Sequence, residues 1–180
     1  HDLARRQRQM CIRDRGVFEE IKYPSGFSDP LNFKALKTYK ERFNEAKTKT
    51  GMDDCFLIGF GKIENINVTI AAQNFDFMGG SVGASAAEAM IKAAEHAVTN
   101  DTPLIVFTCS GGARMDENQY SLQSLPKTTI AVQMVKDAKL PYIVVNTNPT
   151  SGGVSASFGS LGDITLAEPN ALICFAGPRV

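Results

Sequence analysis

Two apolar runs of this sequence each end in the tripeptide Ser-Gly-Gly, and that repeated ending restricts the folds open to the chain. "LIVFTC" leads into Ser110-Gly111-Gly112, and "PYIVVNT" leads through the turn residues 148–150 into Ser151-Gly152-Gly153. Apolar runs rich in β-branched residues predict buried strands. Glycine at a strand exit permits a positive φ and lets another group approach the backbone closely. Because each doublet precedes a segment expected to be helical, the sequence predicts two strand–turn–helix units in succession.

The segment before these units predicts an amphipathic helix. Asp29 is the expected N-cap, Pro30 the first helical residue and Gly51 the C-cap. Its apolar residues recur at helical spacing, at Leu36, Tyr39, Phe43 and Ala46. We therefore expect one face of this helix to be buried.

The rest of the chain alternates strand-like and helix-like segments. Two strand-like runs, 55–64 and 66–77, meet at Glu64-Asn65 and predict a hairpin or a meander. A helix follows, with Ser85 and Glu88 as a capping box. Its expected buried stripe is Ala87, Ile91, Ala94 and Val98. Another helix is expected over 116–139, where Pro126 should kink or restart it. Short strands at 163–169 and 171–177 complete an α/β pattern with parallel crossovers.

The composition places the chain among soluble globular proteins. Its 180 residues are 43% apolar and 21% charged, and the formal net charge is zero, so neither nucleic acid nor an acidic membrane is favoured as a partner. The four cysteines form no C-x-x-C pair, which argues against a zinc ribbon and a disulfide framework within this chain. Reduced cysteines indicate a cytoplasmic compartment. No apolar run approaches the length of a membrane span.

The glycine doublets are the main functional candidates. Unpaired N–H groups at such turns can converge on one oxygen and form an oxyanion hole. A single doublet would more simply be a tight turn, but two doublets with the same strand–turn–helix layout favour the functional interpretation. Competing motifs are incomplete: "MGGSVG" lacks the dinucleotide-binding spacing, no Walker lysine follows a glycine loop, and "GVSAS" misses the nucleophile elbow. His96 falls off the expected helix stripe and is interpreted as a solvated side chain.

Four motifs in order carry a family resemblance. "FDFMGGSVG" (75–83), "FTCSGGARMDE" (107–117), "NPTSGGVSASF" (148–158) and "AEPNALICFAGPRV" (167–180) closely resemble the carboxyltransferase beta subunit of bacterial acetyl-coenzyme A carboxylase. The resemblance runs in register from Asp14 to Val180. It implies a ClpP/crotonase-like fold, a spiral of repeated β-β-α units, in a carboxyltransferase domain over residues 16–180 that is truncated at its C-terminus.

The resemblance also implies a reaction and partners. A carboxyl group would pass from carboxybiotin, borne by the biotin carboxyl carrier protein, to acetyl-CoA, giving malonyl-CoA for fatty acid synthesis. Family members act in a cytoplasmic hetero-oligomer with an alpha subunit of the same fold and with biotin carboxylase. The active site lies at the alpha–beta interface.

Site residues are carried over position by position. The N–H groups of Gly111 and Gly112 would form an oxyanion hole, for either the biotin ureido oxygen or the thioester enolate, and Gly152 and Gly153 would line the second glycine loop. The expected substrate-binding residues are Arg114, Ala113, Arg179, Gly79 and Gly80. For the two arginines, charge support for CoA or the carboxylate and a salt bridge that fixes the loop both remain open. For Gly79 and Gly80, packing is as good an explanation as a wall beside CoA.

The sequence also departs from the family pattern. Bacterial members usually carry an N-terminal four-cysteine zinc ribbon, which is absent here, so no metal is expected in this chain. Residues 1–15 are expected to be a non-native or disordered leader. Pro126 could shift the contact with the alpha subunit. Alternatives are a propionyl-CoA type of carboxyltransferase, a crotonase-fold hydratase or decarboxylase, and a non-catalytic assembly subunit.

Overall fold

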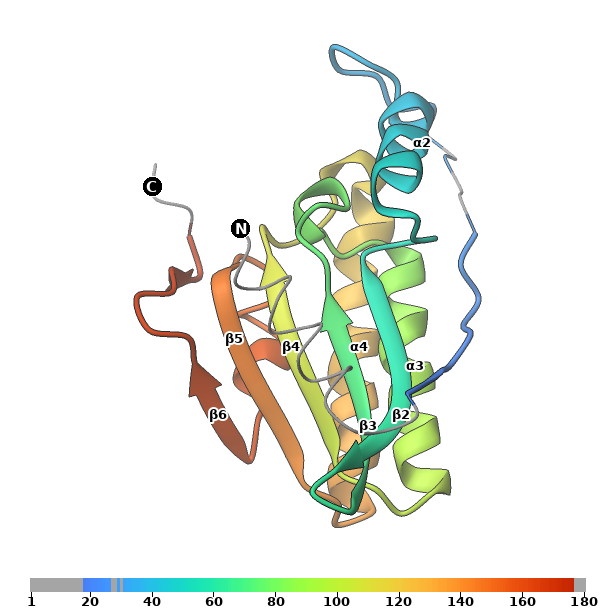
Figure 1. The fold of residues 1–180 in the computed structure, drawn as a ribbon. Coiled ribbons are helices and arrows are strands. Elements are labelled where there is room, and N and C mark those ends of the chain that lie inside the picture. The colour runs from blue at the N-terminus through green and yellow to red at the C-terminus, as the bar shows by residue number, and fades with distance from the viewer. Residues whose placement is uncertain (1–17, 27–28, 30, 177–180) are drawn as a thin grey trace.

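The described part of the chain folds around one mixed sheet. The computed structural model describes residues 18–26, 29 and 31–176 (Figure 1). The strands run in the order β1-β2-β3-β4-β5-β6, and β7 pairs with β5 off this path. Their bounds are β1 (Glu19–Glu20), β2 (Phe56–Ile63), β3 (Ile66–Gln73), β4 (Leu104–Ser110), β5 (Tyr142–Ser151), β6 (Ile164–Ala167) and β7 (Ile173–Cys174).

The sheet confirms the predicted strand pattern. β2 and β3 pair antiparallel through a two-residue turn at Glu64 and Asn65, both with positive φ, as expected for a hairpin of this length. β3, β4, β5 and β6 are mutually parallel neighbours. The predicted α/β domain with parallel crossovers is therefore confirmed.

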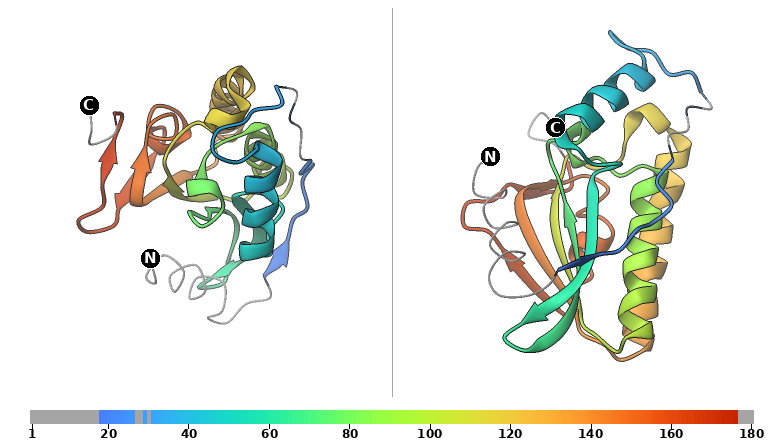
Figure 2. Two further views of the ribbon diagram at one scale, coloured as in Figure 1. Left: turned by 90° about the horizontal axis from the view of Figure 1, so that it is seen from above. Right: turned by 45° about the vertical axis from the view of Figure 1, so that its right-hand side comes forward.

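Two long helices cover one face of the sheet. α3 (Ala84–Thr99) and α4 (Gln119–Asp137) lie side by side against it, and α2 (Tyr39–Thr50) lies beyond the C-terminal ends of the parallel strands (Figure 2, right). Three short 3₁₀ turns complete the order: η1 (Met78–Gly80), η2 (Met115–Glu117) and η3 (Phe158–Ser160). None of the helices in the described residues is both long and apolar enough to cross a bilayer.

The core forms between these helices and the sheet. α3 contributes a face of small residues with Met90 at its centre, and this face permits close packing on both α4 and the strands. Its buried alanines are Ala86, Ala87, Ala89, Ala93, Ala94 and Ala97. Val98, predicted to be buried, is instead exposed. The predicted stripe is wrong at that end because a helix with so many alanines gives only a weak contrast between its faces.

The first helix begins later than predicted. Thr38 is its N-cap and forms a capping box with Glu41, whereas the Asp29 carboxylate accepts the N–H of Phe33 and caps only a turn. Leu36 is therefore exposed rather than buried, and Pro30 lies outside the described residues. The rest of the prediction is confirmed, since Tyr39, Phe43 and Ala46 are buried and Gly51 adopts the left-handed C-cap.

The other two helices also differ from expectation in one detail each. Ser85 does not cap α3: Gly83 is the N-cap, and the Ser85 hydroxyl donates to the carbonyl of Gly26. The Ala84 N–H is bound by the distant Glu117 carboxylate at 2.7 Å. Of the kink or restart expected at Pro126, the restart does not occur, because α4 continues through this residue as one helix.

The turn after β3 packs unusually closely on the end of β4. Gly80 has φ +63°, and a Cβ atom added to it would lie only 2.0 Å from the carbonyl oxygen of Cys109. Its own carbonyl accepts the Ser110 hydroxyl at 2.7 Å and the Gln73 amide at 3.0 Å. Gly79 has a similar φ of +68°, but a Cβ added there meets no atom within 4 Å.

These two neighbouring glycines give a matched test of the close approach. Gly79→Ala should cost about 1–2 kcal/mol of unfolding free energy, the penalty of a left-handed alanine. Gly80→Ala adds a backbone clash and should cost about 3 kcal/mol or more. Urea denaturation of the two variants measures the difference, and equal losses would contradict the observed contact.

Candidate functional site

The three glycine doublets, far apart in the sequence, meet at the C-terminal ends of β3, β4 and β5, the upper strand ends in Figure 1. The Gly111 N–H donates to the Gly79 carbonyl at 2.9 Å. A Cβ added to Gly112 would lie 3.2 Å from Cα of Gly152. Parallel α/β sheets place ligands at this edge. The doublets therefore form one continuous backbone surface at the expected position for a site.

The two N–H groups predicted to form an oxyanion hole are already hydrogen-bonded. That of Gly111 is bound to Gly79, and that of Gly112 is bound to the Ser110 hydroxyl at 3.0 Å. The turn folds back on its neighbours, so these donors are directed into the protein. The predicted use of these two N–H groups is therefore contradicted by the structure. The N–H of Gly152 is also engaged, by the carbonyls of Cys174 and Phe175.

Other N–H groups of the same turns remain available, among them two that lie at adjoining strand ends. Within the described residues, the N–H groups of Ala113 and Gly153 have no hydrogen-bond acceptor. Ala113 pairs with Val82 in a parallel bridge whose bonds are made by the flanking residues, Gly112 and Arg114, so the Ala113 N–H points away from Val82. A Cβ added to Gly153 would lie 3.5 Å from the Ala113 nitrogen. Two unpaired donors from neighbouring turns are thus close to each other.

Arg114 does not face this surface. Its side chain is 1% exposed and is ion-paired with Asp54 and Glu117. Burial by itself disfavours the guanidinium cation, but the Asp54 carboxylate outweighs burial and raises the pKa of Arg114 well above its usual range. Of the two interpretations left open by the sequence, the structure supports the salt bridge that fixes the loop, and the prediction of a substrate contact is wrong. Arg179 lies outside the described residues.

The sequence analysis assigned no role at this site to four residues around Arg114. Asp54, Tyr39, Ser81 and Glu117 all contact its guanidinium, and of these only Tyr39 was expected to be buried. Burial raises the pKa of the Tyr39 hydroxyl, which donates to Glu117 at 2.6 Å and therefore stays protonated. The only local feature that could have pointed to a buried role for Asp54 was its position directly before an apolar strand.

The two acid–base candidates considered from the sequence, Glu117 and His96, both have hydrogen-bond partners within the protein. Glu117 is 7% exposed and fully engaged. His96 lies near the C-terminal end of α3, where burial lowers its pKa and its ring accepts or donates a bond to Thr69 at 3.0 Å. The described residues also contain no group of three or more side chains that could hold a metal ion. The surface can stabilise a negatively charged oxygen through backbone donors, without side-chain proton transfer.

Known proteins resemble this chain over nearly its whole length. A beta subunit of acetyl-coenzyme A carboxylase carboxyl transferase from Dinoroseobacter shibae is 54% identical over 178 residues, which are 99% of this chain and 56% of that relative. The chain thus spans about half the length of the curated relatives it matches.

Solved structures agree on the fold. The transcarboxylase 12S, with methylmalonyl-coenzyme A bound, superposes with a TM-score of 0.74 at 27% identity, over 97% of this chain and 31% of that chain. A Pseudomonas malonate decarboxylase hetero-tetramer superposes with a TM-score of 0.67 at 21% identity, over 97% of this chain and 61% of that chain, which shows the fold alone. The predicted crotonase-like fold is confirmed.

The family described as the carboxyl transferase domain matches residues 31–180. This range contains all three glycine turns and the buried Arg114 cluster. With this match and the identity to the beta subunit above, the chain belongs to the carboxyl transferase domain family.

Proposed function

We propose that this chain forms one half of a carboxyltransferase site that moves a carboxyl group from carboxybiotin to acetyl-CoA, giving malonyl-CoA. The observation that supports this most directly is the pair of unpaired N–H groups, of Ala113 and Gly153, at adjoining strand ends. The similarity to named acetyl-CoA carboxylase beta subunits favours acetyl-CoA as acceptor.

The role of the donors follows from the charge that develops in the reaction. When the acetyl thioester loses a proton, negative charge gathers on its carbonyl oxygen, and two fixed N–H groups stabilise it without reorganising. Carboxybiotin, as co-substrate, would supply the carboxyl group and accept the proton. This fits a surface that presents backbone donors while Glu117, the candidate base beside the central turn, is buried and already hydrogen-bonded. The same pair could instead hold the biotin ureido oxygen, and both roles need the same donors.

The remaining glycines shape the surface rather than donate to the substrate. Gly79 and Gly111 form a backbone contact, and Gly80 is packed on the Cys109 carbonyl. A Cβ added to Gly152 would lie 3.2 Å from the Gly111 carbonyl oxygen and from Cα of Gly112. In our proposal these glycines keep side chains out of the space that the thioester and biotin would enter.

The proposal includes partners because half a site needs its complement. We infer a hetero-oligomer with a carboxyltransferase alpha subunit of the same fold, supplied by a biotin carboxyl carrier protein and a biotin carboxylase, in the cytoplasm. The similarity to a beta subunit supports this assignment. The zinc ribbon of family members would belong to sequence outside this chain.

The main alternative, a crotonase-fold hydratase, requires a glutamate that can exchange protons with water. Asp116 and Glu117 are the acids that follow the central doublet, and both are buried: Asp116 is ion-paired with Arg42, and Glu117 is bound to Ala84, Tyr39 and Arg114. This observation weighs against hydration chemistry.

Co-expression of the full-length subunit with its alpha partner tests the proposal. We expect carboxyl transfer from carboxybiotin to acetyl-CoA, with a lower kcat/KM for propionyl-CoA and lower still for butyryl-CoA. Product formation is followed by mass spectrometry. Preference for propionyl-CoA would reassign the acceptor, and hydration of an enoyl-CoA without carboxyl transfer would refute the proposal.

A substitution at Gly112 tests the donor pair directly. A Cβ there would lie 3.1 Å from the Gly153 nitrogen, at a φ of +111°, and would crowd the Gly153 N–H. We expect Gly112→Ala to lower kcat by roughly a hundredfold, the usual effect of losing one oxyanion donor.

The control is Gly51→Ala, which places an equally left-handed alanine at the end of α2, away from the strand ends. It should lose stability but keep its kcat. Full activity in the folded Gly112→Ala complex would exclude Gly153 as a donor.

A further inference from the structure

The buried guanidinium of Arg114 joins four segments that are distant in the sequence, and two of them carry the glycine turns. We propose that Arg114 is a positioning residue for the carboxyl transfer proposed above. By holding the turn after β3 against the turn after β4, it fixes the direction of the Ala113 N–H. This inference rests on the proposed function, and it adds a residue that never touches the substrate.

The anchor of the arrangement is a two-point ion pair. Arg114 Nη2 lies 2.6 Å from Asp54 Oδ1, and Nη1 lies 3.0 Å from Oδ2. Both side chains are 1% exposed. A fork of this kind sets the orientation of the guanidinium plane as well as its position. Asp54 also accepts the Cys55 N–H at 2.6 Å, so it is fixed to the start of β2.

From this anchor Arg114 reaches the turn after β3. Its Nη2 donates to the Ser81 carbonyl at 2.8 Å, and its Nε donates to the Ser81 hydroxyl at 3.2 Å. Ser81 directly follows the Gly79–Gly80 pair. The Arg114 backbone N–H also donates to the Val82 carbonyl at 2.9 Å. Because Ala113 precedes Arg114 in the chain, a shift of either turn changes where the Ala113 N–H points.

Glu117 extends the same network to two helices. Its Oε1 accepts bonds from Arg114 and from the Tyr39 hydroxyl of α2, while Oε2 accepts the first N–H of α3 at Ala84. Gly83 makes room for this carboxylate, since a Cβ there would lie 2.3 Å from Oε1. The start of α3, the buried face of α2 and the glycine turns are thus tied to one cation.

The guanidinium has no donor left for a ligand. Nε uses its hydrogen on Ser81, Nη2 uses two on Asp54 and Ser81, and Nη1 uses two on Asp54 and the Tyr39–Glu117 pair. Phe77 and Phe43 lie near it, with ring centroids 5.6 and 6.0 Å from Cζ. A lysine would supply the charge but not the fork, so the geometry requires arginine.

Arg114→Lys in the full-length alpha–beta complex separates positioning from its alternatives. We expect kcat to fall by roughly tenfold or more, because a small misplacement of a catalytic donor is costly. The KM for acetyl-CoA should stay within about twofold, since no substrate contact is lost. Backbone hydrogen exchange should accelerate in residues 79–84 and 110–117 together.

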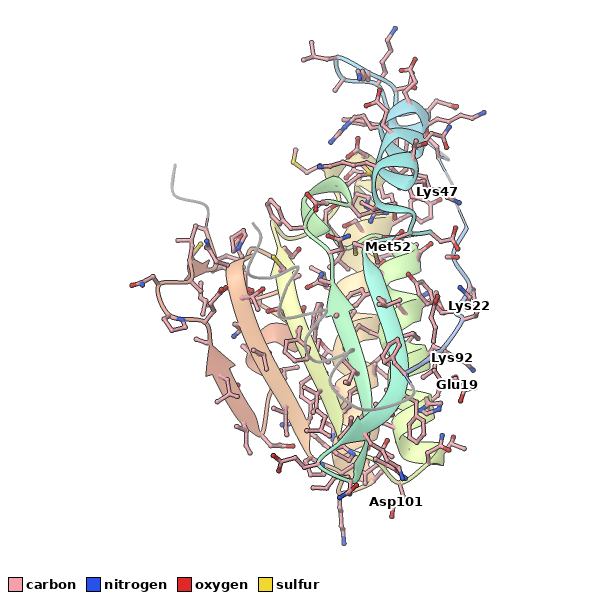
Figure 3. The ribbon with its side chains drawn as sticks, viewed as in Figure 1. Glu19, Lys22, Lys47, Met52, Lys92 and Asp101 are labelled. Carbon is pink, nitrogen blue, oxygen red and sulfur yellow. The ribbon has the colours of Figure 1, made fainter. Side chains whose placement is uncertain are left out.

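A milder variant guards against a simple folding failure. Tyr39→Phe removes one hydroxyl from Glu117 and leaves the Asp54 fork intact, so it should lower kcat by a smaller factor with the same unchanged KM. Lys92→Met is the control, because this exposed lysine is paired with Glu95 on the same helix and lies on α3 below the strand ends (Figure 3).

The outcomes separate three cases. A raised KM with unchanged kcat would mean that Arg114 contacts the substrate. A lower melting temperature with unchanged kcat and exchange confined to other segments would reduce Arg114 to a stabilising residue. Either result overturns the inference while wild-type transfer persists. Absence of transfer in the wild-type complex would refute the proposed function instead.

Discussion

Backbone packing between the turns at the strand ends is the constraint on which the rest of this structure depends. Gly80 lies so close to the Cys109 carbonyl that no side chain fits, and Gly112 and Gly152 meet backbone to backbone. Because the turns are in such close contact, main-chain atoms rather than side chains form the surface of the candidate site. Main-chain N–H groups can then face a ligand that side chains would otherwise keep away.

Most N–H groups of these glycine turns are hydrogen-bonded within the protein. Those of Gly111, Gly112 and Gly152 form bonds that hold the turns together. The unpaired donors appear one residue later in each turn, at Ala113 and Gly153. A doublet therefore serves mainly to let the chain reverse, and the donors that we propose for the substrate lie beside the glycine that makes the reversal possible. The sequence therefore provided good reason to predict an oxyanion hole at the N–H groups of Gly111 and Gly112, but in the structure both are already hydrogen-bonded.

The sequence predicted local features well and failed on contacts between distant segments. The hairpin at Glu64-Asn65 and the Gly51 cap depend on neighbouring residues, and both were correct. The cap of α3 comes instead from Glu117, thirty-three residues after the N–H that it accepts, so a local capping-box rule had nothing to detect. Pairing of Arg114 with Asp54 spans sixty residues, and it follows only from the way β2, η1 and the turn after β4 are brought together. From the sequence alone, a substrate contact and a structural salt bridge explained Arg114 equally well.

A buried ion pair is a poor means of adding stability, because desolvation offsets most of its attraction. Arg114 is nonetheless placed among Asp54, Glu117 and two aromatic rings, where a well-packed apolar side chain could fill the same volume. What an apolar side chain could not do is bind the Ser81 carbonyl and the Glu117 carboxylate at fixed angles. The cluster therefore contributes geometry more than free energy. A site made of backbone donors depends on such geometry. A main-chain N–H group has no rotamers, so its direction is set entirely by the surrounding structure.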